Sequence, residues 1–310
     1  MEHRLDRLQR EGVFDHRRIR RNFSRSAASY AAVAQLQARV REELLQSLTY
    51  RDDPGLALPP PQVVLDLGAG LGEAAAAMQQ RWPQAQTIAL DWALPMLRLH
   101  AAAPRRWRLR KPNAPLRVCA DARRLPLPDA SVDVVFSNLC LQWIADLPAQ
   151  LAELRRVMKP QGMLLFTSFG PGTLRELRDA FAMADAAPHV SPFASIAQLG
   201  DALMLAGFRD PVLDRDTYPE HYPDLPALMR QLRALGATNA LAGRRASLTG
   251  KQRFTRAAQA YEALREPAGL PVMWEVISAM AWALQPGVPQ RVGGVEIAGF
   301  PASGIPIRRR

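Results

Sequence analysis

Short apolar runs alternate with helix-like stretches through the middle of the chain. Runs of five to eight mostly apolar residues predict strands at 63–68, 87–91, 116–121, 132–139 and 163–169. Between them, apolar residues recur at helical spacing in 73–81, 95–103 and 147–158. Strands that alternate with helices in this way favour an α/β fold with a doubly wound, mostly parallel sheet and helices on both faces.

A helical pattern also precedes the first strand. Apolar residues recur at helical spacing from Ser29 to Leu48, which predicts an amphipathic helix there. A segment rich in proline and glycine, 52–61, then breaks the chain. Residues 1–22 are charged and show no clear pattern. We therefore interpret residues 1–58 as an N-terminal helical cap.

The pattern changes after the fifth strand. Residues 171–205 are mostly helical, 211–218 predict a strand, 226–239 a basic amphipathic helix, and 270–284 a final strand. The main domain is thus expected over 59–285, with a helical insertion on the substrate side at about 171–245. Residues 286–310, rich in glycine and proline, predict a flexible basic tail.

Composition narrows the class of protein. The chain has 310 residues and is 48% hydrophobic, which is enough for one large domain. No apolar run approaches the roughly 20 residues of a membrane span, and the first residues do not resemble a signal peptide. Cys119 and Cys140 stand in apolar segments, so we expect buried thiols in a cytoplasmic protein. No cysteine–histidine cluster has metal-ligand spacing.

The charge of the chain is strongly positive. Its formal net charge is +11 and its pI is about 10.6, with arginines gathered near 17–21, 105–111 and 308–310. Such an excess can attract nucleic acid, an anionic membrane or an acidic protein. Charge runs more often form only a solvated surface, so the charge by itself does not choose a partner.

The stretch VLDLGAGLG, residues 64–72, is the strongest single motif. Glycines after a first strand let the backbone approach a ligand at the start of the next helix. A dinucleotide fingerprint would carry a further glycine, but position 73 is Glu, whose charge disfavours a diphosphate. Asp66 adds a second negative charge. Together these residues favour a ligand with a positive ammonium group and disfavour a nicotinamide dinucleotide.

Polar residues also stand at the ends of the next three strands. Asp91 ends the second strand, where a carboxylate can accept hydrogen bonds from both ribose hydroxyls, and Trp92 and Met96 follow it. Those two residues are expected either to pack around the sugar and base of a ligand or to take part only in ordinary packing of the helix on the sheet.

Asp121 ends the third strand and can accept from an adenine amino group, with the Ala122 backbone beside it. Asn138 ends the fourth strand, where a ligand crevice is expected. We expect two further residues, Gln142 and Trp143, to face the same crevice.

The set VLDLGAGLG, ALDWA, CADARRLPLPD, FSNLCLQW and RRVMKPQGMLLFTSF resembles the class I S-adenosylmethionine-dependent methyltransferases over roughly residues 60–170. The resemblance implies S-adenosylmethionine as cofactor and a seven-stranded sheet whose last strand is antiparallel. It also implies that Gly68, Ala69, Gly70 and the Asp66 region hold the methionine part. Three other residues would complete the site, with Asp91 at the ribose and Asp121 with Ala122 at the adenine.

The methyl acceptor has to be inferred from other segments. The fourth strand leads into NLCLQ, which lacks the prolines typical of base-amine methyltransferases, and Cys140 does not follow a proline as in cytosine-C5 enzymes. The segments RRNFSRSAASYAAVAQLQ, FTSFGPGTLREL and LMRQLRALGATN resemble the malonyl-acyl-carrier-protein O-methyltransferase family of early biotin synthesis. A quinone-ring C-methyltransferase, an RNA methyltransferase or a cofactor-binding protein without catalysis remain alternatives.

That family's reaction methylates the free carboxylate of a malonyl thioester. Such a carboxylate is ionised at neutral pH, so it needs a cation to orient it rather than a general base. Arg230 or Arg233 would clamp it, and Tyr30 would close over the cofactor and donate a hydrogen bond. Alternatively, the arginines form a solvated helix face and Tyr30 only packs.

The expected partner is malonyl-acyl carrier protein, an acidic protein, or malonyl-coenzyme A; neither nucleic acid nor a membrane span is expected. A basic surface would steer an acidic carrier electrostatically. The candidate residues for this are Arg20, Arg21, Arg105, Arg106 and Arg108.

Overall fold

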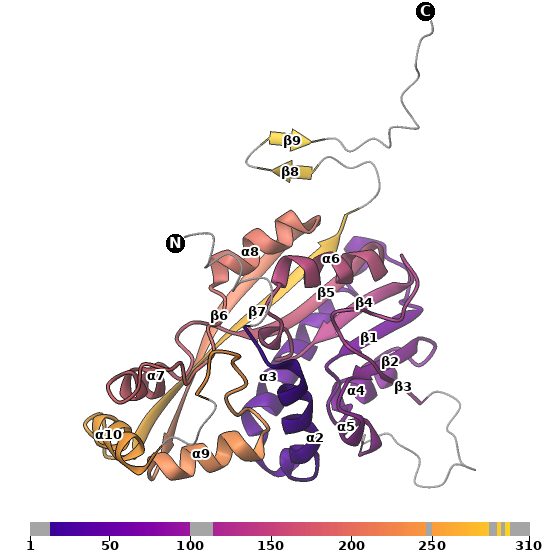
Figure 1. The fold of residues 1–310 in the computed structure, drawn as a ribbon. Coiled ribbons are helices and arrows are strands. Elements are labelled where there is room, and N and C mark those ends of the chain that lie inside the picture. Colours follow the sequence, from indigo (N-terminus) through magenta and orange to yellow (C-terminus); the bar gives the residue numbers. More distant parts are fainter. Residues whose placement is uncertain (1–12, 100–113, 246–249, 285–289, 293–294, 298–310) are drawn as a thin grey trace, which may run out of the picture.

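Seven strands form one sheet in the order β3-β2-β1-β4-β5-β7-β6 (Figure 1). The structure is a computed structural model that describes residues 13–99, 114–245, 250–284, 290–292 and 295–297. The parallel strands are β1 (Val63–Leu67), β2 (Gln86–Asp91), β3 (Leu116–Cys119), β4 (Val132–Ser137) and β5 (Met158–Phe169). Strand β7 (Leu270–Ala283) is antiparallel to β5 and to β6 (Phe208–Tyr222). The predicted mostly parallel sheet and its antiparallel last strand are confirmed.

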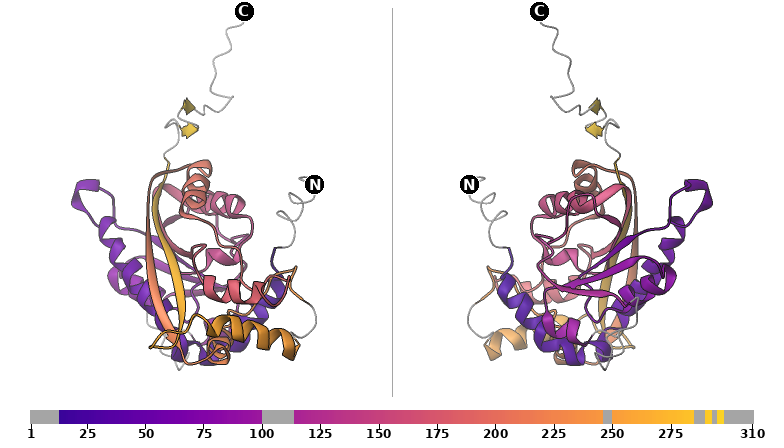
Figure 2. Two further views of the ribbon diagram at one scale, coloured as in Figure 1. Left: turned by 90° about the vertical axis from the view of Figure 1, so that its left-hand side faces the viewer. Right: turned by 90° about the vertical axis from the view of Figure 1, so that its right-hand side faces the viewer.

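Helices cover both faces of this sheet (Figures 1 and 2). Successive strand residues point to opposite faces, and the core divides accordingly. Val64 and Phe136 pack with the helices α3 (Gln35–Gln46) and α4 (Glu73–Arg81) on one face. Leu65 and Phe166 pack with α6 (Leu147–Val157) and α8 (Ile196–Leu205) on the other face. The doubly wound arrangement predicted from the alternating pattern is therefore present.

The first helix of the N-terminal region begins before Ser29, where the sequence predicted its start. Helix α2 spans His16–Val33, and its N-cap Asp15 accepts a hydrogen bond from the Arg18 backbone N–H. The helix stops at Ala34, where α3 starts in a new direction. The expected single helix from Ser29 to Leu48 is thus wrong at its start and in its continuity. The region of residues 16–22 that lacked a clear pattern is the first part of a helix.

A second group of helices surrounds the lower end of the long β6–β7 pair (Figure 1). It consists of α7 (Arg175–Ala182), α9 (Leu225–Ala234) and α10 (Lys251–Glu262). Their apolar residues share one buried cluster with Phe169 of β5 and Trp274 of β7. The sequence predicted α9, whereas no prediction covered α10. These helices come from two separate stretches of chain, because α8, which packs on the sheet, and β6, which belongs to it, lie between α7 and α9.

Several element bounds differ from those expected. Strand β5 begins earlier than predicted, since its first residue, Met158, already pairs with Val132 of β4. Strand β6 is longer at both ends because antiparallel pairing with β7 extends it. Helix α5 is Leu94–Arg98, and the expected continuation to residue 103 lies outside the described residues. Short 3-10 helices occupy Ser47–Tyr50, Pro54–Leu56 and Leu141–Trp143 (η1, η2 and η4), and a small hairpin, β8 (Gln290–Val292) with β9 (Val295–Ile297), lies in the C-terminal segment. No helix within the described residues is long and apolar enough to cross a membrane.

Candidate functional site

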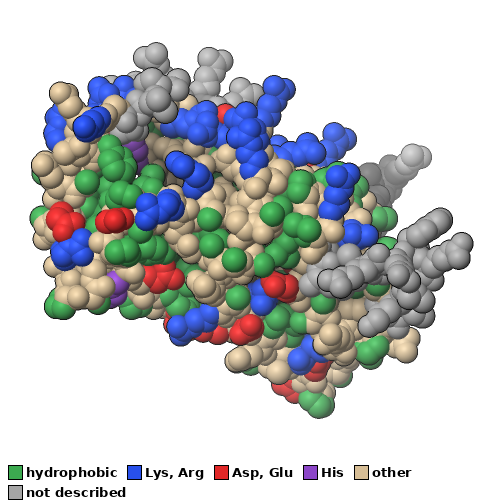
Figure 3. Space-filling view, turned by 90° about the horizontal axis from the view of Figure 1, so that it is seen from below, with side chains coloured by type: hydrophobic (Ala, Val, Ile, Leu, Met, Phe, Trp, Pro, Cys, Tyr) green, Lys and Arg blue, Asp and Glu red, His purple; other side chains and the backbone are tan. Residues whose placement is uncertain are grey.

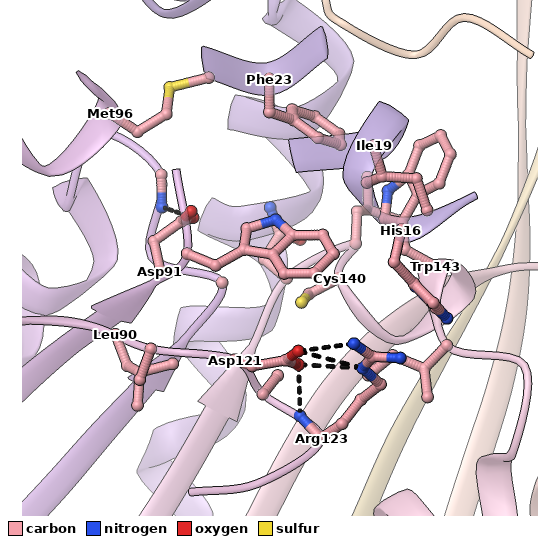
Figure 4. A pocket seen from close by; sticks show the side chains of 18 of the residues that line it. His16, Ile19, Phe23, Leu90, Asp91, Met96, Asp121, Arg123, Cys140 and Trp143 are labelled. Atoms are coloured by element: carbon pink, nitrogen blue, oxygen red, sulfur yellow. Dashed lines mark hydrogen bonds and ion pairs between the residues drawn. The ribbon is translucent and has the colours of Figure 1, made fainter. Parts of the chain in front are cut away.

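The carboxyl ends of β1, β2, β3 and β4 meet at one edge of the sheet and line a pocket, which we call the strand-end pocket (Figure 4). Its volume is about 100 Å³. The lining includes nine of the residues predicted for the site: Tyr30, Gly68, Gly70, Asp91, Trp92, Met96, Asp121, Ala122 and Asn138. Parallel strands end at the same edge, so the strand pattern was sufficient to bring eight of these residues together, whereas Tyr30 is brought there by α2.

The two glycines of this loop serve different purposes. A Cβ atom on Gly68 would lie 2.5 Å from the Cys140 sulfur, so Gly68 lets β1 and the β4 loop approach each other. A Cβ atom on Gly70 would meet nothing within 4 Å. Gly70 therefore borders open space, which is what a bound ligand requires of the backbone at this position.

Asp91 connects the β2 end to the glycine loop. Its Oδ2 accepts from the Gly70 N–H at 3.0 Å, and its Oδ1 accepts from the Ala93 N–H at 2.7 Å. Burial raises the pKa of this carboxyl above its ordinary value. The carboxylate fixes the loop and still lines the pocket, where it can accept hydrogen bonds from a pair of ligand hydroxyls.

Asp121 is held by Arg123, a residue that was not predicted for the site. Arg123 donates to both carboxylate oxygens, with Nη2 2.7 Å from Oδ2 and Nε 3.1 Å from Oδ1 (Figure 4). Burial raises the pKa of Asp121, but these hydrogen bonds outweigh it and leave the pKa below its ordinary value. A ligand amino group at Asp121 would share an ionised, already oriented carboxylate.

A smaller pocket of about 70 Å³ adjoins the first and shares Tyr30, Gly68, Gly70 and Asn138 with it. We call it the Arg41 pocket, since Arg41 of α3 lines it together with Asp66, Ala69 and Glu73. Predicted residues Asp66 and Ala69 thus lie beside, not inside, the strand-end pocket. One elongated ligand can occupy both pockets, because their shared residues form a continuous wall.

Asp66 is 2% exposed, and its Oδ2 accepts from the Ala75 N–H of α4 at 2.9 Å. Burial raises the pKa of this carboxyl to about 7. An ammonium group placed in the Arg41 pocket would favour the charged carboxylate. A ligand amino group placed there would therefore lie beside a carboxyl whose charged form it favours.

Glu73 does not present the free negative charge that was expected from the sequence. Its side chain forms an ion pair with Arg41, whose own side chain is only 18% exposed. The two residues are 32 positions apart, so no local pattern predicts the pair. Arg41 brings a cation to the same pocket as Asp66, which gives the pocket a group for a ligand carboxylate as well as one for a ligand ammonium.

Tyr30 of α2 lies where the two pockets meet. Its hydroxyl has no hydrogen-bond partner among the described residues. Burial, together with the charges of Asp91 and Glu73, raises the pKa of this phenol. The hydroxyl is therefore neutral at physiological pH and available as a donor at the junction.

Residues after β4 take different places from one another. Asn138 donates from Nδ2 to the Gln37 carbonyl of α3 at 3.0 Å and accepts from the Thr167 hydroxyl at 2.8 Å, so it joins α3 to the sheet. Gln142 is buried and donates to the Leu139 carbonyl at 2.7 Å. It lines neither the strand-end pocket nor the Arg41 pocket. The expectation that Gln142 faces the crevice is wrong. Trp143 does face it.

Of the two cysteines, only Cys119 clearly departs from the expected burial. Cys140 is enclosed, and burial raises the pKa of its thiol to about 12, so it stays protonated at neutral pH and is no thiolate nucleophile. Cys119 is exposed rather than buried. It ends β3 at the sheet edge, where the apolar pattern of its strand does not produce burial.

Helix α2 separates the strand-end pocket from a much larger cavity. One of its faces gives His16, Ile19, Phe23 and Tyr30 to the strand-end pocket (Figure 4). Of these, only Tyr30 was predicted from the sequence. The helical spacing of Ile19, Phe23 and Tyr30 is visible in the sequence, but the many charges between them obscure it.

The larger cavity, which we call the wide cavity, has a volume of about 820 Å³. Its inner wall is aromatic: Phe169 lies 5.4 Å from Trp274 and 5.6 Å from Phe193 between ring centroids. The space-filling view shows lysine and arginine side chains gathered along one rim of an apolar hollow on the lower face (Figure 3). Trp143 borders both this cavity and the strand-end pocket, so the two spaces adjoin there.

Arg230 and Arg233, predicted to clamp the acceptor, both lie on α9 and line the wide cavity. Both are exposed, and neither has an acidic partner among the described residues. Of the arginines expected to meet a carrier protein, Arg20 and Arg21 lie on exposed positions of α2. Three others, Arg105, Arg106 and Arg108, lie outside the described residues.

Comparison with known proteins is consistent with this geometry. The family described as "Methyltransferase domain" matches residues 65–166, which contain all four strand ends. The crystal structure of the YcgJ protein from Bacillus subtilis has the same fold, with a TM-score of 0.54, 16% identity, and coverage of 79% of this chain and 99% of that one. At that identity the likeness concerns the fold alone.

Relatives of known name resemble the chain over nearly its whole length. The malonyl-[acyl-carrier protein] O-methyltransferase of Xylella fastidiosa (strain M23) is 54% identical over 300 residues, covering 96% of this chain and 98% of the relative. That of Methylovorus sp. (strain MP688) is 42% identical over 277 residues, covering 88% and 90%. The chain therefore belongs to the malonyl-[acyl-carrier protein] O-methyltransferase family.

Proposed function

We propose that this protein transfers a methyl group from S-adenosylmethionine to the free carboxylate of a malonyl thioester carried by acyl carrier protein. The product is the malonyl methyl ester from which pimeloyl and biotin synthesis starts. The observation that carries the proposal is full-length similarity to proteins of that name at up to 54% identity. The adjoining pockets, one bordered by strand ends and one with an aromatic wall, fit a cofactor and an acyl acceptor.

S-adenosylmethionine supplies a methyl group on a positive sulfonium, activated for transfer. The residues of the strand-end pocket fit its adenosine part, with Asp91 at the ribose hydroxyls and Asp121 beside Ala122 at the adenine. The Arg41 pocket fits the amino-acid part. There, Asp66 would face the ammonium and Arg41 the carboxylate. The reacting centre then falls where the pockets share Tyr30.

The acceptor carboxylate is already a nucleophile at neutral pH. The protein has to hold it in line with the methyl–sulfur bond and keep water away. The neutral Tyr30 hydroxyl is suited to donate a hydrogen bond to it, and Arg230 or Arg233 on α9 to supply the orienting cation. Methylation removes the negative charge, so the ester loses its attraction to these groups and can leave.

The other acceptors considered from the sequence are disfavoured by family membership. A quinone ring or an RNA base carries no carboxylate at the methylated atom, so neither requires an arginine to orient the reacting group. We further propose the carrier protein rather than coenzyme A as the physiological carrier, following the names of the relatives. A cytoplasmic location accords with the two free cysteines, since reducing compartments keep thiols unpaired.

The test is an acceptor assay with labelled S-adenosylmethionine. Malonyl-carrier protein, malonyl-coenzyme A and succinyl-carrier protein are offered in parallel, and base-labile methyl ester is measured by mass spectrometry. We expect ester on the malonyl carrier with the highest kcat/KM. The proposal fails if no malonyl ester forms while another acceptor, such as RNA or a quinol, takes the label.

A further inference from the structure

The wide cavity carries more positive charge than its surroundings neutralise. Six arginines line it: Arg18, Arg25, Arg230, Arg233, Arg244 and Arg245. No aspartate or glutamate is among the described residues that line it. Arg245 pairs with Asp185 at 2.8 Å, and Arg244 with Asp15 at 3.2 Å. The remaining four have no salt bridge within the part of the chain that the structure describes.

Among these arginines, Arg18 and Arg244 carry like charges that repel each other. The charge of Arg244 lowers the pKa of Arg18, second only to the effect of burial. The Nε of Arg18 is buried without a hydrogen-bond partner in the described structure. Like charges and an unpaired donor are unfavourable in a partly buried place unless an anion joins them.

Asp15, the neighbouring carboxylate, does not bind the Arg18 guanidinium. Its Oδ1 accepts from the Arg18 backbone N–H at 3.0 Å, and its Oδ2 accepts from Arg244 Nη2 at 3.2 Å. Neither oxygen accepts from the Arg18 guanidinium within the described structure. The pair remains a site for a further anion with several oxygen atoms.

The position of Arg18 on α2 limits which anion the pair can receive. Arg18, Asn22, Arg25 and Ser29 follow one another on one face of α2, and all of them line the wide cavity. Tyr30, at the proposed reacting centre, lies twelve residues after Arg18, which is about 18 Å along the helix axis. A single malonyl carboxylate cannot be at both ends of that path.

We infer that Arg18 and Arg244 bind the phosphodiester of a phosphopantetheine arm, while its malonyl end reaches Tyr30. The inference rests on the proposed function. A phosphopantetheine arm has an anionic phosphate at one end, its thioester at the other, and a span between them comparable to that along α2. Guanidinium groups match phosphate oxygens in geometry and charge. The cavity volume of about 820 Å³ far exceeds what the three-carbon malonyl group needs.

Carrier protein and coenzyme A share this phosphodiester, whereas malonyl-pantetheine lacks it. The experiment therefore compares kcat/KM for all three malonyl thioesters in the full-length enzyme and in Arg18→Gln, Arg244→Gln and the double variant. We expect the double variant to lose about tenfold or more with the phosphate-bearing substrates. Malonyl-pantetheine should be turned over as by the unchanged enzyme, because it makes no use of the pair.

A matched control is Arg215→Gln, which removes the same charge from an exposed position of β6 that lines none of these pockets. It should leave all three values unchanged. Arg18→Lys keeps the charge without the two-pronged geometry and should lie between the unchanged enzyme and Arg18→Gln. Malonyl-pantetheine turnover also reports folding, since a misfolded variant would lose that activity too.

Loss with both carriers, or with the carrier protein alone, supports the inference, and the second result identifies the carrier's arm as the source of the phosphate. No loss, equal loss with malonyl-pantetheine, or loss with coenzyme A alone overturns it. If the unchanged enzyme methylates none of the three thioesters, the proposed function fails instead. The two failures are therefore distinguishable.

Discussion

Arg41 shows how one side chain completes a pocket that the sequence motif only outlines. The motif supplies Asp66 and the glycine loop from one short stretch. Arg41 comes from α3 and meets Glu73 at the start of α4. A guanidinium has five N–H donors, so Arg41 can pair with Glu73 and still donate to a ligand. We therefore expect Arg41 to contact the carboxylate of the cofactor's methionine part.

Arg41→Met should weaken S-adenosylhomocysteine binding by about tenfold, corresponding to about 1.4 kcal/mol. Binding of 5′-methylthioadenosine, which lacks the amino-acid part, should not change. Isothermal titration calorimetry measures both. Arg39→Met is the matched control on the same helix, since the Arg39 side chain is 68% exposed. Equal weakening for both ligands would show that Arg41 acts on the pocket as a whole.

Asp66 gives the cofactor site a dependence on pH. Its pKa of about 7 in the free protein means that it is largely protonated below that value. A ligand ammonium favours the charged form, so binding should strengthen as the pH rises through about 7 and then level off. We expect this rise for S-adenosylhomocysteine between about pH 6 and pH 8.

Asp66→Asn should bind S-adenosylhomocysteine more weakly at pH 8 and should lose most of the rise. A pH series of dissociation constants for both proteins measures the difference. 5′-Methylthioadenosine has no ammonium and serves as the control ligand. A rise that persists unchanged in Asp66→Asn would assign the titration to another group.

At the scale of elements, α2 decides the architecture of the site. It lies between the cofactor pockets and the wide cavity, and it is attached at several points. Ser29 donates to the Ala234 carbonyl of α9 at 3.1 Å, and Asn22 donates to Thr238 at 2.7 Å. These contacts fix α2 as the wall between the strand-end pocket and the wide cavity. Movement of α9 relative to α2 should therefore change acceptor binding more than cofactor binding.

Gly236→Ala tests that attachment. Its φ of +78° and a Cβ atom only 2.6 Å from the Ser26 hydroxyl oxygen disfavour any side chain there. We expect a loss of about 1–3 kcal/mol in the free energy of unfolding by urea, and a higher KM for the malonyl substrate. Gly243→Ala, where a Cβ atom meets nothing within 4 Å, is the control and should be nearly neutral. A Gly236→Ala protein of unchanged stability would contradict the tight packing of α2 on α9.

At the scale of the whole molecule, the structure shows where part of the net charge of +11 lies. Arginines line the wide cavity, and basic side chains gather along the rim of the hollow on that face (Figure 3). An acidic carrier approaching this side would be attracted before contact, which raises the association rate. Part of the excess positive charge that the composition records is therefore gathered around the wide cavity.

The salt dependence of turnover should reveal this attraction. We expect kcat/KM for malonyl-carrier protein to fall several-fold between about 50 and 500 mM NaCl, because salt screens charges beyond a few ångströms. Malonyl-pantetheine, which is small and bears a single charge, should change much less. Steady-state assays across the salt series measure both. Parallel curves for the two substrates would argue against steering by the basic rim.

The sequence by itself determined the sheet and the cofactor edge. Alternating apolar runs predict parallel strands, and parallel strands place their carboxyl ends together. The strand pattern alone therefore assigns Asp91, Asp121 and Asn138 to one edge of the sheet. The glycine loop follows from the same local signal. Periodicity and turn chemistry are properties of neighbouring residues, and this is why they can be read along the chain.

Only the tertiary structure decided what surrounds that edge. The meeting of Arg41 with Glu73, of Arg18 with Arg244, and the burial of Gln142 depend on how distant segments pack. Helix α2 lines the strand-end pocket with one face and the wide cavity with another, because the sheet edge lies on one side of it and α9 on the other. Contacts over such separations in sequence leave no local pattern, since they are fixed by the packing of whole elements around a shared core.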